Sequence, residues 1–266
     1  MSEQTVASPP KFRSVSQVLD MDRCPHMYYL KRIRKAWSRP AAWLPQGIAV
    51  HHGVELFEKS GRTMTLTEVQ KEVGEKYDDE VNALCEVTPN FAVWFASGPY
   101  TGELDIVRRY GIAQDQAEKY YDFRMVGAGS RSWPALMPDG KPGVEYDFEV
   151  EFGDVPVRGY IDYIDEWFRP DDVKTGNKPG DRFQLETYAG AIEKLTGVKP
   201  TTGTFWMGKT GKQTLPADLS HVTQEYLTDV FGAADERIKA EQFEAKPEPS
   251  KCMFCSVRTA CSFSAA

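Results

Sequence analysis

The sequence predicts an α/β protein: a mainly helical first half, then a sheet-containing unit, and finally a helix with a cysteine-rich tail. Two observations predict this class. Hydrophobic residues recur at helical spacing before residue 143, whereas segments that alternate in the manner of strands begin after it. The chain of 266 residues, 41% hydrophobic and 27% charged, also has the composition of a globular protein with a sizeable core.

The first half carries helix signals at several points. Ser14 and Ser16 can cap the first helix, and Thr65 or Thr67 can start the third. The segment before residue 125 forms one or two helices, with a break expected near Gly98-Pro99. The expected helices cover 17–34, 47–59, about 65–84 and 91–124.

The second half predicts a β-β-β-α-β unit followed by one long helix. VEYDFEVEF alternates like a strand, and VPVRGYIDYIDEWF follows it after a Gly153-Asp154 turn. The stripe of Phe183, Leu185 and Tyr188 predicts an amphipathic helix. In order, the elements are strands 144–152 and 155–168, a short strand 172–174, helix 181–195, strand 201–207 and helix 222–238.

We expect one domain over 14–266, after a flexible lead-in over 1–13. Its parts are a mainly helical region 14–143, a sheet-and-helix region 144–210, and a C-terminal helix and tail 211–266. No apolar run approaches the roughly 18 residues of a membrane helix, and no signal-peptide core is present, so we expect a cytoplasmic protein. The net charge of −7 neither indicates nor excludes a nucleic-acid substrate.

Two aspartates and a lysine predict a metal-assisted hydrolytic site. Residues two apart on a strand share a face, so Asp172 and Lys174 project together. Asp162 lies beside them if the preceding strand pairs antiparallel. Two carboxylates suit a hard divalent cation, and the ammonium group would steady developing charge. Asp-x-Lys is also a common surface pattern, but RPDDVKTG is such poor strand sequence that it favours a site.

Four motifs in order resemble the PD-(D/E)xK nuclease superfamily, in its RecB-like branch. GIAVHHG is similar to the first motif, GYID to the second, DVKTG to the Asp/Glu-x-Lys motif and QLETY to the trailing Gln-x-x-x-Tyr motif. The resemblance covers roughly 47–188 and implies a restriction-endonuclease-like mixed central sheet flanked by helices. The positions carried over are Gly47, His51, Gly159, Asp162, Asp172, Lys174, Gln184 and Tyr188.

The resemblance also implies roles for these residues. His51, Asp162, Asp172 and the carbonyl of Val173 would bind Mn²⁺ or Mg²⁺, and an imidazole ligand favours Mn²⁺ somewhat. Lys174 would be the catalytic lysine, with Gln184 and Tyr188 facing the site from the following helix. Several alternatives stay open: His52 rivals His51, Asp171 rivals Asp172, Tyr188 could be core, and Glu149 could be an auxiliary acid.

Three of the five cysteines lie within ten residues of one another near the C-terminus. In a cytoplasmic protein this clustering favours metal ligation over disulfides. RecB-like nucleases with a cluster resemble this arrangement, with one cysteine before the nuclease motifs and three after them. The resemblance implies a 4Fe-4S cluster, for which structural zinc is the rival. The implied ligands are Cys24, Cys252, Cys255 and Cys261. Cys85 is left over.

Basic and aromatic residues suggest where DNA could bind. Lys178 and Arg182 lie close to the Asp-x-Lys motif and are candidate phosphate contacts. A second candidate mixes charges with rings that could stack on unpaired bases, although it would equally suit a solvated helix face. Its members are Tyr28, Tyr29, Lys31, Arg32, Arg34, Lys35, Trp37 and Arg39.

The expected function is a metal-dependent deoxyribonuclease, by resemblance an exonuclease acting on single-stranded DNA or DNA ends. The chain is similar to the CRISPR-associated exonucleases of the fourth Cas family and to AddB-type nuclease domains. That likeness implies a homo-oligomer or protein partners of the recombination or CRISPR type as further candidates. The alternative is a non-catalytic DNA-binding or adaptor protein held by a structural zinc site.

Overall fold

The computed structural model describes residues 9–266, so most of the expected lead-in lies outside the described residues. By contacts the chain divides into two compact units. The central unit comprises Pro40–Phe148 and Tyr160–Val222. The terminal unit comprises the described residues up to Arg39, Glu149–Gly159 and Thr223–Ala266. The description of 14–266 as one domain stays a prediction.

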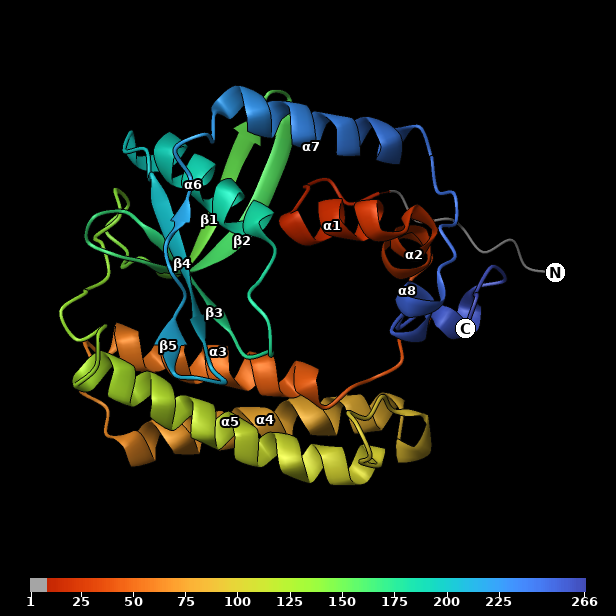
Figure 1. The fold of residues 1–266 in the computed structure, drawn as a ribbon, viewed down its shortest axis with the longest axis horizontal. Coiled ribbons are helices and arrows are strands. Elements are labelled where there is room, and N and C mark those ends of the chain that lie inside the picture. The colour runs from red at the N-terminus through yellow and green to blue at the C-terminus, as the bar shows by residue number, and fades with distance from the viewer. Residues whose placement is uncertain (1–8) are drawn as a thin grey trace. The chain divides into compact units, whose positions relative to one another are not determined.

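A mixed sheet organises the central unit (Figure 1). The strand order is β1-β2-β3-β4-β5, with β6 paired to β4. β3 pairs antiparallel with β2 and parallel with β4, and the crossover from β3 to β4 is helix α6 (Arg182–Thr196). The predicted α/β class and mixed sheet are thus confirmed. The strands are β1 Val144–Phe152, β2 Val155–Ile164, β3 Pro170–Lys174, β4 Thr202–Met207, β5 Lys212–Gln213 and β6 Ala217–Asp218.

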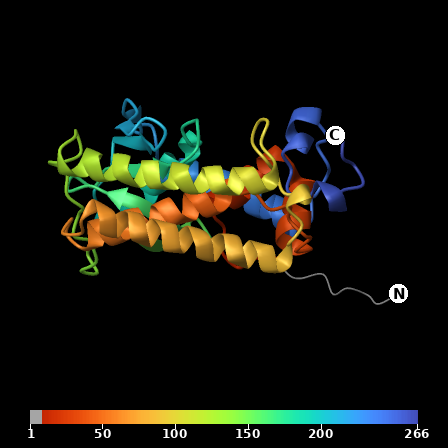
Figure 2. The ribbon, with the colours of Figure 1, turned by 90° about the horizontal axis from the view of Figure 1, so that it is seen from below.

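Three long helices pack against one another beside the sheet (Figure 2). They are α3 (Trp43–Lys59), α4 (Leu66–Val87) and α5 (Gly102–Met125). Their apolar faces form one buried cluster that includes Val173 of β3 and Trp206 of β4. Because side chains alternate along a strand, the neighbours of these two residues face the other way, where α6 packs on β3 and β4.

The helix boundaries follow local chemistry. Thr65 caps α4 through a reciprocal capping box with Glu68, as its sequence position suggests. The break expected near Gly98-Pro99 is present, because only a short 3₁₀ turn, η2 (Phe91–Val93), precedes α5. Helix α3 begins at Trp43, four residues before the predicted start.

The terminal unit corrects one prediction. The single helix expected over 17–34 is instead α1 (Val15–Arg23), α2 (Pro25–Tyr28) and a π-helical turn, η1 (Tyr29–Ile33). Pro25 has no N–H to continue the first helix, and the residue before a proline is pushed toward extended backbone, as Cys24 shows with φ −166° and ψ 107°. The break leaves Cys24 half-buried at a corner between two helices.

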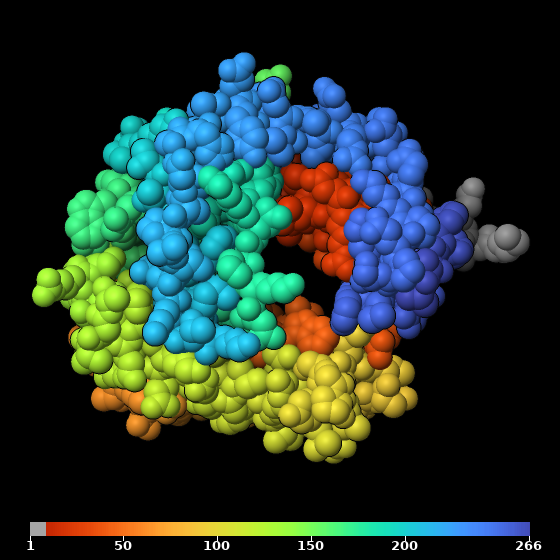
Figure 3. All heavy atoms as spheres, viewed as in Figure 1, coloured from red at the N-terminus to blue at the C-terminus, as the bar shows by residue number. Residues whose placement is uncertain are grey.

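A long C-terminal helix completes this unit. Helix α7 (Gln224–Lys239) contributes Phe231, which stacks on Phe152, and Asp235, which forms a buried ion pair with Arg13 at 2.7 Å. The tail is less irregular than predicted, since it forms α8 (Pro249–Met253) and a 3₁₀ turn, η3 (Arg258–Ala260). Figure 3 shows this C-terminal segment in blue against the red N-terminal helices. No helix within 9–266 combines the length and apolarity needed to cross a bilayer.

Candidate active site

Strand β3 carries polar side chains into the interior of the central unit. Pro170 occupies the first strand position, where its missing N–H removes no necessary ladder bond. Asp171 and Asp172 are 4% and 0% exposed, although aspartate is normally a surface residue. Burying two adjacent carboxylates is costly unless each finds a compensating partner. The unfavourable strand sequence noted above therefore coincides with a polar site on each face of the sheet.

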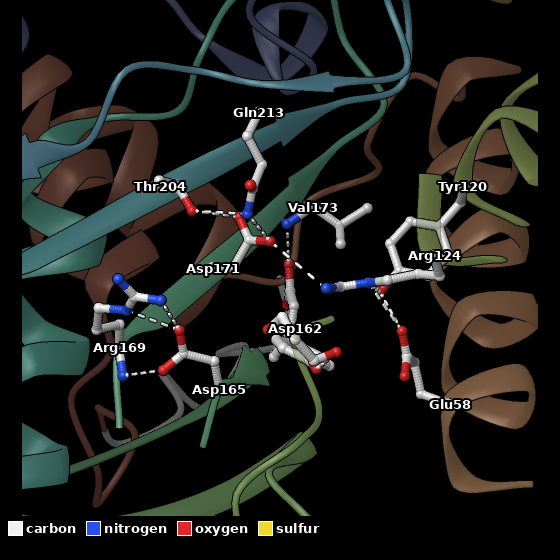
Figure 4. Close-up of polar contacts among 12 residues, drawn as sticks. Glu58, Tyr120, Arg124, Asp162, Asp165, Arg169, Asp171, Val173, Thr204 and Gln213 are labelled. Carbon is white, nitrogen blue, oxygen red and sulfur yellow. Dashed lines mark hydrogen bonds and ion pairs between the residues drawn. The ribbon is translucent and has the colours of Figure 1, made fainter. Parts of the chain in front are cut away.

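At the site, a hydrogen bond to a side chain replaces the backbone pairing between β2 and β3. The two strands pair at Tyr163 with Asp171 and at Ile164 with Pro170. One step further, the Val173 N–H donates to Asp162 Oδ2 at 2.7 Å (Figure 4). The carbonyl oxygen of Val173 lies 3.0 Å from His51 Nε2 of α3. Both backbone groups of Val173 thus meet predicted site residues.

A third carboxylate joins His51 and Asp162. The Nδ1 atom of His51 lies 2.9 Å from Glu145 Oε1 and 3.6 Å from Asp162 Oδ1. Ligand atoms of these three residues all lie within 4.8 Å of one another, which matches what one cation requires. Sequence reasoning considered Glu149 instead, but that residue is exposed on β1. Glu145 is the second residue of the same strand, and its backbone φ of +43° is unusual for a non-glycine residue. Nothing in the alternation of VEYDFEVEF distinguished the two acids.

The lysine and the trailing motif form a continuous polar chain. Lys174 Nζ lies 2.6 Å from Asp172 Oδ2 and donates to Gln184 Oε1 at 2.8 Å. Gln184 Nε2 in turn donates to the hydroxyl of Tyr188 at 2.7 Å. Gln184 and Tyr188 lie one turn apart on α6, whose start is fixed by Asp181 capping the N–H of Phe183. The sequence prediction that these side chains converge with Lys174 agrees with this geometry.

The charges at the site are mutually adjusted. Burial alone would lower the pKa of His51, but Asp162, Glu145 and Asp172 outweigh burial and raise it to about 9. Burial raises the pKa of Asp162 to about 6, against the opposing effect of His51. Burial and the nearby Asp162 raise the pKa of Asp172 to about 7, although Lys174 opposes this. Without a bound cation, the site therefore has too little positive charge to stabilise the ionised forms of both aspartates.

A divalent cation fits this donor set. The Oδ1 atom of Asp172 is buried and has no hydrogen-bond partner among the described residues, so one lone-pair donor is left over. A buried carboxylate oxygen without a hydrogen-bond partner is energetically costly, and a bound cation would satisfy it. Carboxylate and carbonyl oxygens with one imidazole suit Mg²⁺ or Mn²⁺. The two alternative ligand candidates lie elsewhere. His52 lies 4.0 Å from Glu72, and Asp171 points to the opposite face of the sheet.

Gly180 shapes the space that Lys174 occupies. A Cβ atom at this position would lie 2.3 Å from Lys174 Cε and 2.9 Å from the Phe205 ring. We therefore expect Gly180→Ala to push the ammonium group out of place and to lower nuclease activity about a hundredfold, the cost typical of a misplacement of about 1 Å. The measurement is the single-turnover cleavage rate, together with the temperature of unfolding, which should change little.

Gly176→Ala provides the matched control for this prediction. A Cβ atom added at Gly176, four residues away in the same loop, meets nothing within 4 Å. This variant should retain nearly full activity. Equal activity of the two variants would show that the close approach of Gly180 does not position Lys174.

The four predicted cluster cysteines line a common cavity in the terminal unit. Cys24, Cys252, Cys255 and Cys261 surround it together with apolar side chains such as Met27, Leu30 and Phe263. Burial raises the pKa of the Cys255 thiol, and the thiols of Cys24 and Cys261 are near enough to add to that shift. Cys85 lies on α4 and packs against the core of the central unit. The cysteine predicted to be left over is thus in the other unit.

The candidate DNA contacts are placed differently from one another. Lys178 is exposed, whereas Arg182 is engaged with the carbonyl of Asp218 and with Glu186. In the terminal unit, Lys31 and Arg32 pair with Asp20, and Tyr28 is fully buried. These three residues therefore contribute to the fold; the alternative to DNA contact was a solvated helix face whose aromatic residues belong to the core.

The fold and the site together are those of one class of nuclease, in which the central strand of a mixed sheet brings two carboxylates and a lysine together. The model of the PD-(D/E)XK nuclease superfamily matches residues 13–262, and the chain belongs to this superfamily. Membership implies a nuclease acting on DNA. Two phage proteins, each called Gene 69 protein, are similar over nearly their whole length. The protein of Mycobacterium phage D29 is 45% identical over 260 residues, covering 94% of this chain and 96% of the relative. That of Mycobacterium phage L5 is 43% identical over 276 residues, covering 94% and 95%.

Proposed function

We propose that this protein is a metal-dependent deoxyribonuclease of the RecB-like branch, an exonuclease acting on single-stranded DNA or on DNA ends. The observation that carries the proposal is the meeting of His51, Glu145 and Asp162 within 4.8 Å, beside the Asp172–Lys174 pair. In this proposal His51, Asp162, Asp172 and the Val173 carbonyl hold Mn²⁺ or Mg²⁺. Glu145 is added to that ligand set.

The chain's own groups prepare the reaction. A cation held by these residues would polarise a phosphoryl oxygen and make a water molecule bound to it more acidic. Lys174 is held by Asp172 and Gln184, so its ammonium group is fixed before substrate arrives and can stabilise charge that develops on the phosphate. His51 carries a proton at neutral pH in the metal-free protein, because its pKa is about 9. That proton must leave before the imidazole can act as a ligand.

In this proposal, the role of the trailing motif is to hold Lys174 in place through a chain of hydrogen bonds. Tyr188 is 4% exposed, and burial raises the pKa of its hydroxyl, so it stays protonated at neutral pH. It accepts a hydrogen bond from Gln184, which orients the Gln184 carbonyl oxygen toward Lys174. Both residues are thus positioning residues for the lysine.

The test is digestion of end-labelled single-stranded and double-stranded DNA, with and without Mn²⁺. We expect loss of label as short products only when the cation is present. Glu145→Gln should reduce the rate by at least a hundredfold at limiting Mn²⁺, whereas Glu149→Gln, four residues along the same strand and exposed, should leave it unchanged. Degradation of circular single strands at the rate of linear ones would exclude an exonuclease, and equal activity without cation would exclude the metal site.

We further propose that the cysteines hold a 4Fe-4S cluster rather than zinc. A zinc ion bonded to sulfur at about 2.3 Å holds its thiolates about 3.8 Å apart. Within the described residues, no three of the cysteine sulfurs lie within 4.8 Å of one another. The four thiols line one common cavity together with apolar side chains, a setting that suits a cluster held by four thiolates. Iron and acid-labile sulfide analysis of anaerobically purified protein checks this, and stoichiometric zinc without iron would overturn it.

A further inference from the structure

A second polar cavity lies in the central unit, on the face of β3 that carries Asp171. Its volume is about 270 Å³, and its lining includes Arg131, Tyr163, Trp167, Asp171 and Gln213. Adjacent strand residues face opposite ways, so this cavity is separated from Asp172 and Lys174 by the sheet itself. The nuclease site described above does not use it.

The floor of the cavity is a preformed hydrogen-bond network (Figure 4). The carboxylate of Asp171 accepts hydrogen bonds from the Thr204 hydroxyl and from Gln213 Nε2, both at 2.8 Å. Arg124 lies 3.6 Å from the same carboxylate and stacks on the Tyr163 ring, 3.9 Å from its centroid. Its charge is already met by Glu58 at 2.9 Å. The floor is therefore polar and preorganised, but it offers an anion no uncompensated positive charge.

The rim has a different character. The ring of Trp167 is 57% exposed, and the Arg169 guanidinium lies 4.7 Å from its centroid, held by an ion pair with Asp165 at 2.7 Å. Arg131 is exposed and forms no ion pair or hydrogen bond within residues 9–266. An open indole face beside arginines is an arrangement that stacks nucleobases and holds phosphates.

We propose that this cavity binds one nucleotide, whose base stacks on Trp167 and whose phosphate pairs with Arg131. The carboxylates of Asp165 and Asp171 oppose a bare anion in the cavity. A nucleotide avoids that repulsion, because its uncharged base can enter while its phosphate stays at the rim. The side-chain amide oxygen of Gln213 has no hydrogen-bond partner among the described residues, so it can accept a hydrogen bond from the amino group of a base.

The nucleotide can be a free nucleoside monophosphate or one unit of a single strand. Only the second source rests on the proposed function. Both share the same chemistry, a planar base and a phosphate, and the experiment separates them. It is carried out in EDTA, so that no cation recruits phosphate to His51 and Asp162.

The test is calorimetric titration of the full chain with dAMP, deoxyadenosine and a twelve-residue oligothymidylate. Trp167→Ala should weaken dAMP binding about tenfold, within the range expected for loss of one base–aromatic stack. Arg131→Ala should weaken dAMP but not deoxyadenosine. Trp133→Ala, which removes another exposed ring that does not line the cavity, is the matched control and should bind as the wild type does. Trp167→Phe keeps a ring and should retain most of the affinity.

Each outcome bears on the proposal. If both dAMP and the oligonucleotide weaken in Trp167→Ala, the cavity takes a strand unit; if dAMP alone weakens, it takes free nucleotide. Wild-type protein that binds neither, or variants that bind both normally, would overturn the site. A protein that binds nucleotide here but cleaves no DNA would refute only the proposed nuclease function. A protein that cleaves DNA, but whose nucleotide binding is unchanged in the Trp167 and Arg131 variants, would refute only the proposed nucleotide site in this cavity.

Discussion

Lys174→Ala should lower the rate of DNA cleavage by about a thousandfold while the protein remains folded. The ammonium group is fixed by Asp172 at 2.6 Å and by Gln184 at 2.8 Å, so it meets developing charge without reorganising. Removing one preorganised group of this kind typically costs about 10²–10³ in rate. The loss should not come from a weaker cation site. Lys174 lowers the pKa of Asp172, and its removal leaves a carboxyl group that attracts protons and cations alike more strongly.

The measurement is the single-turnover rate on end-labelled single strands at saturating and at limiting Mn²⁺. The loss of rate should persist at saturating cation, and the apparent affinity for Mn²⁺ should not be weaker than that of the wild type. Lys199→Ala is the control, since Lys199 is exposed on the loop after α6. A Lys174→Ala enzyme within threefold of wild type at saturating Mn²⁺ would remove the lysine from the reaction.

The sequence predicted most of this site because short-range rules govern it. Asp172 and Lys174 share a face by strand alternation, and Gln184 and Tyr188 share a face by helical periodicity. The sequence left the pairing of the preceding strand open, and it is the antiparallel pairing of β2 with β3 that brings Asp162 beside them. These relations depend only on backbone geometry, which local sequence specifies well.

Other features depended on contacts between distant segments. Glu145 meets His51 across 94 positions of sequence, and nothing in its own strand distinguishes it from Glu149. The nucleotide cavity joins the loop after α5 to β3, β4 and β5, and its components are individually ordinary. The break at Cys24 is of a different kind: Pro25 is a local signal for it, since a proline cannot donate the backbone hydrogen bond that continues a helix, and the predicted helix over 17–34 did not take it into account.

Replacing Cys24 by serine should abolish binding of the proposed cluster and markedly destabilise the terminal unit. A link between Cys24 and the tail closes a loop of more than two hundred residues. By the chain-entropy argument used for other cross-links, such a loop stabilises the folded state by about 5–6 kcal/mol. Weaker contacts remain between the same segments, including Arg23 Nη2 to the carbonyl of Lys251 at 2.9 Å and the Arg39 N–H to the carbonyl of Ser256 at 2.8 Å. These alone should not hold the tail at elevated temperature.

Thermal unfolding by circular dichroism, with absorbance at about 400 nm and metal analysis, measures this effect. Cys85→Ser is the matched control and should keep both the absorbance and the metal, because Cys85 lies in the central unit. Below its unfolding temperature, Cys24→Ser should still cleave DNA at close to the wild-type rate, since His51, Asp162 and Lys174 also belong to the central unit. Full metal content in Cys24→Ser would exclude this thiol as a ligand. Loss of cleavage in a variant that is still folded would instead give the cluster a part in the reaction, which a purely structural cross-link does not have.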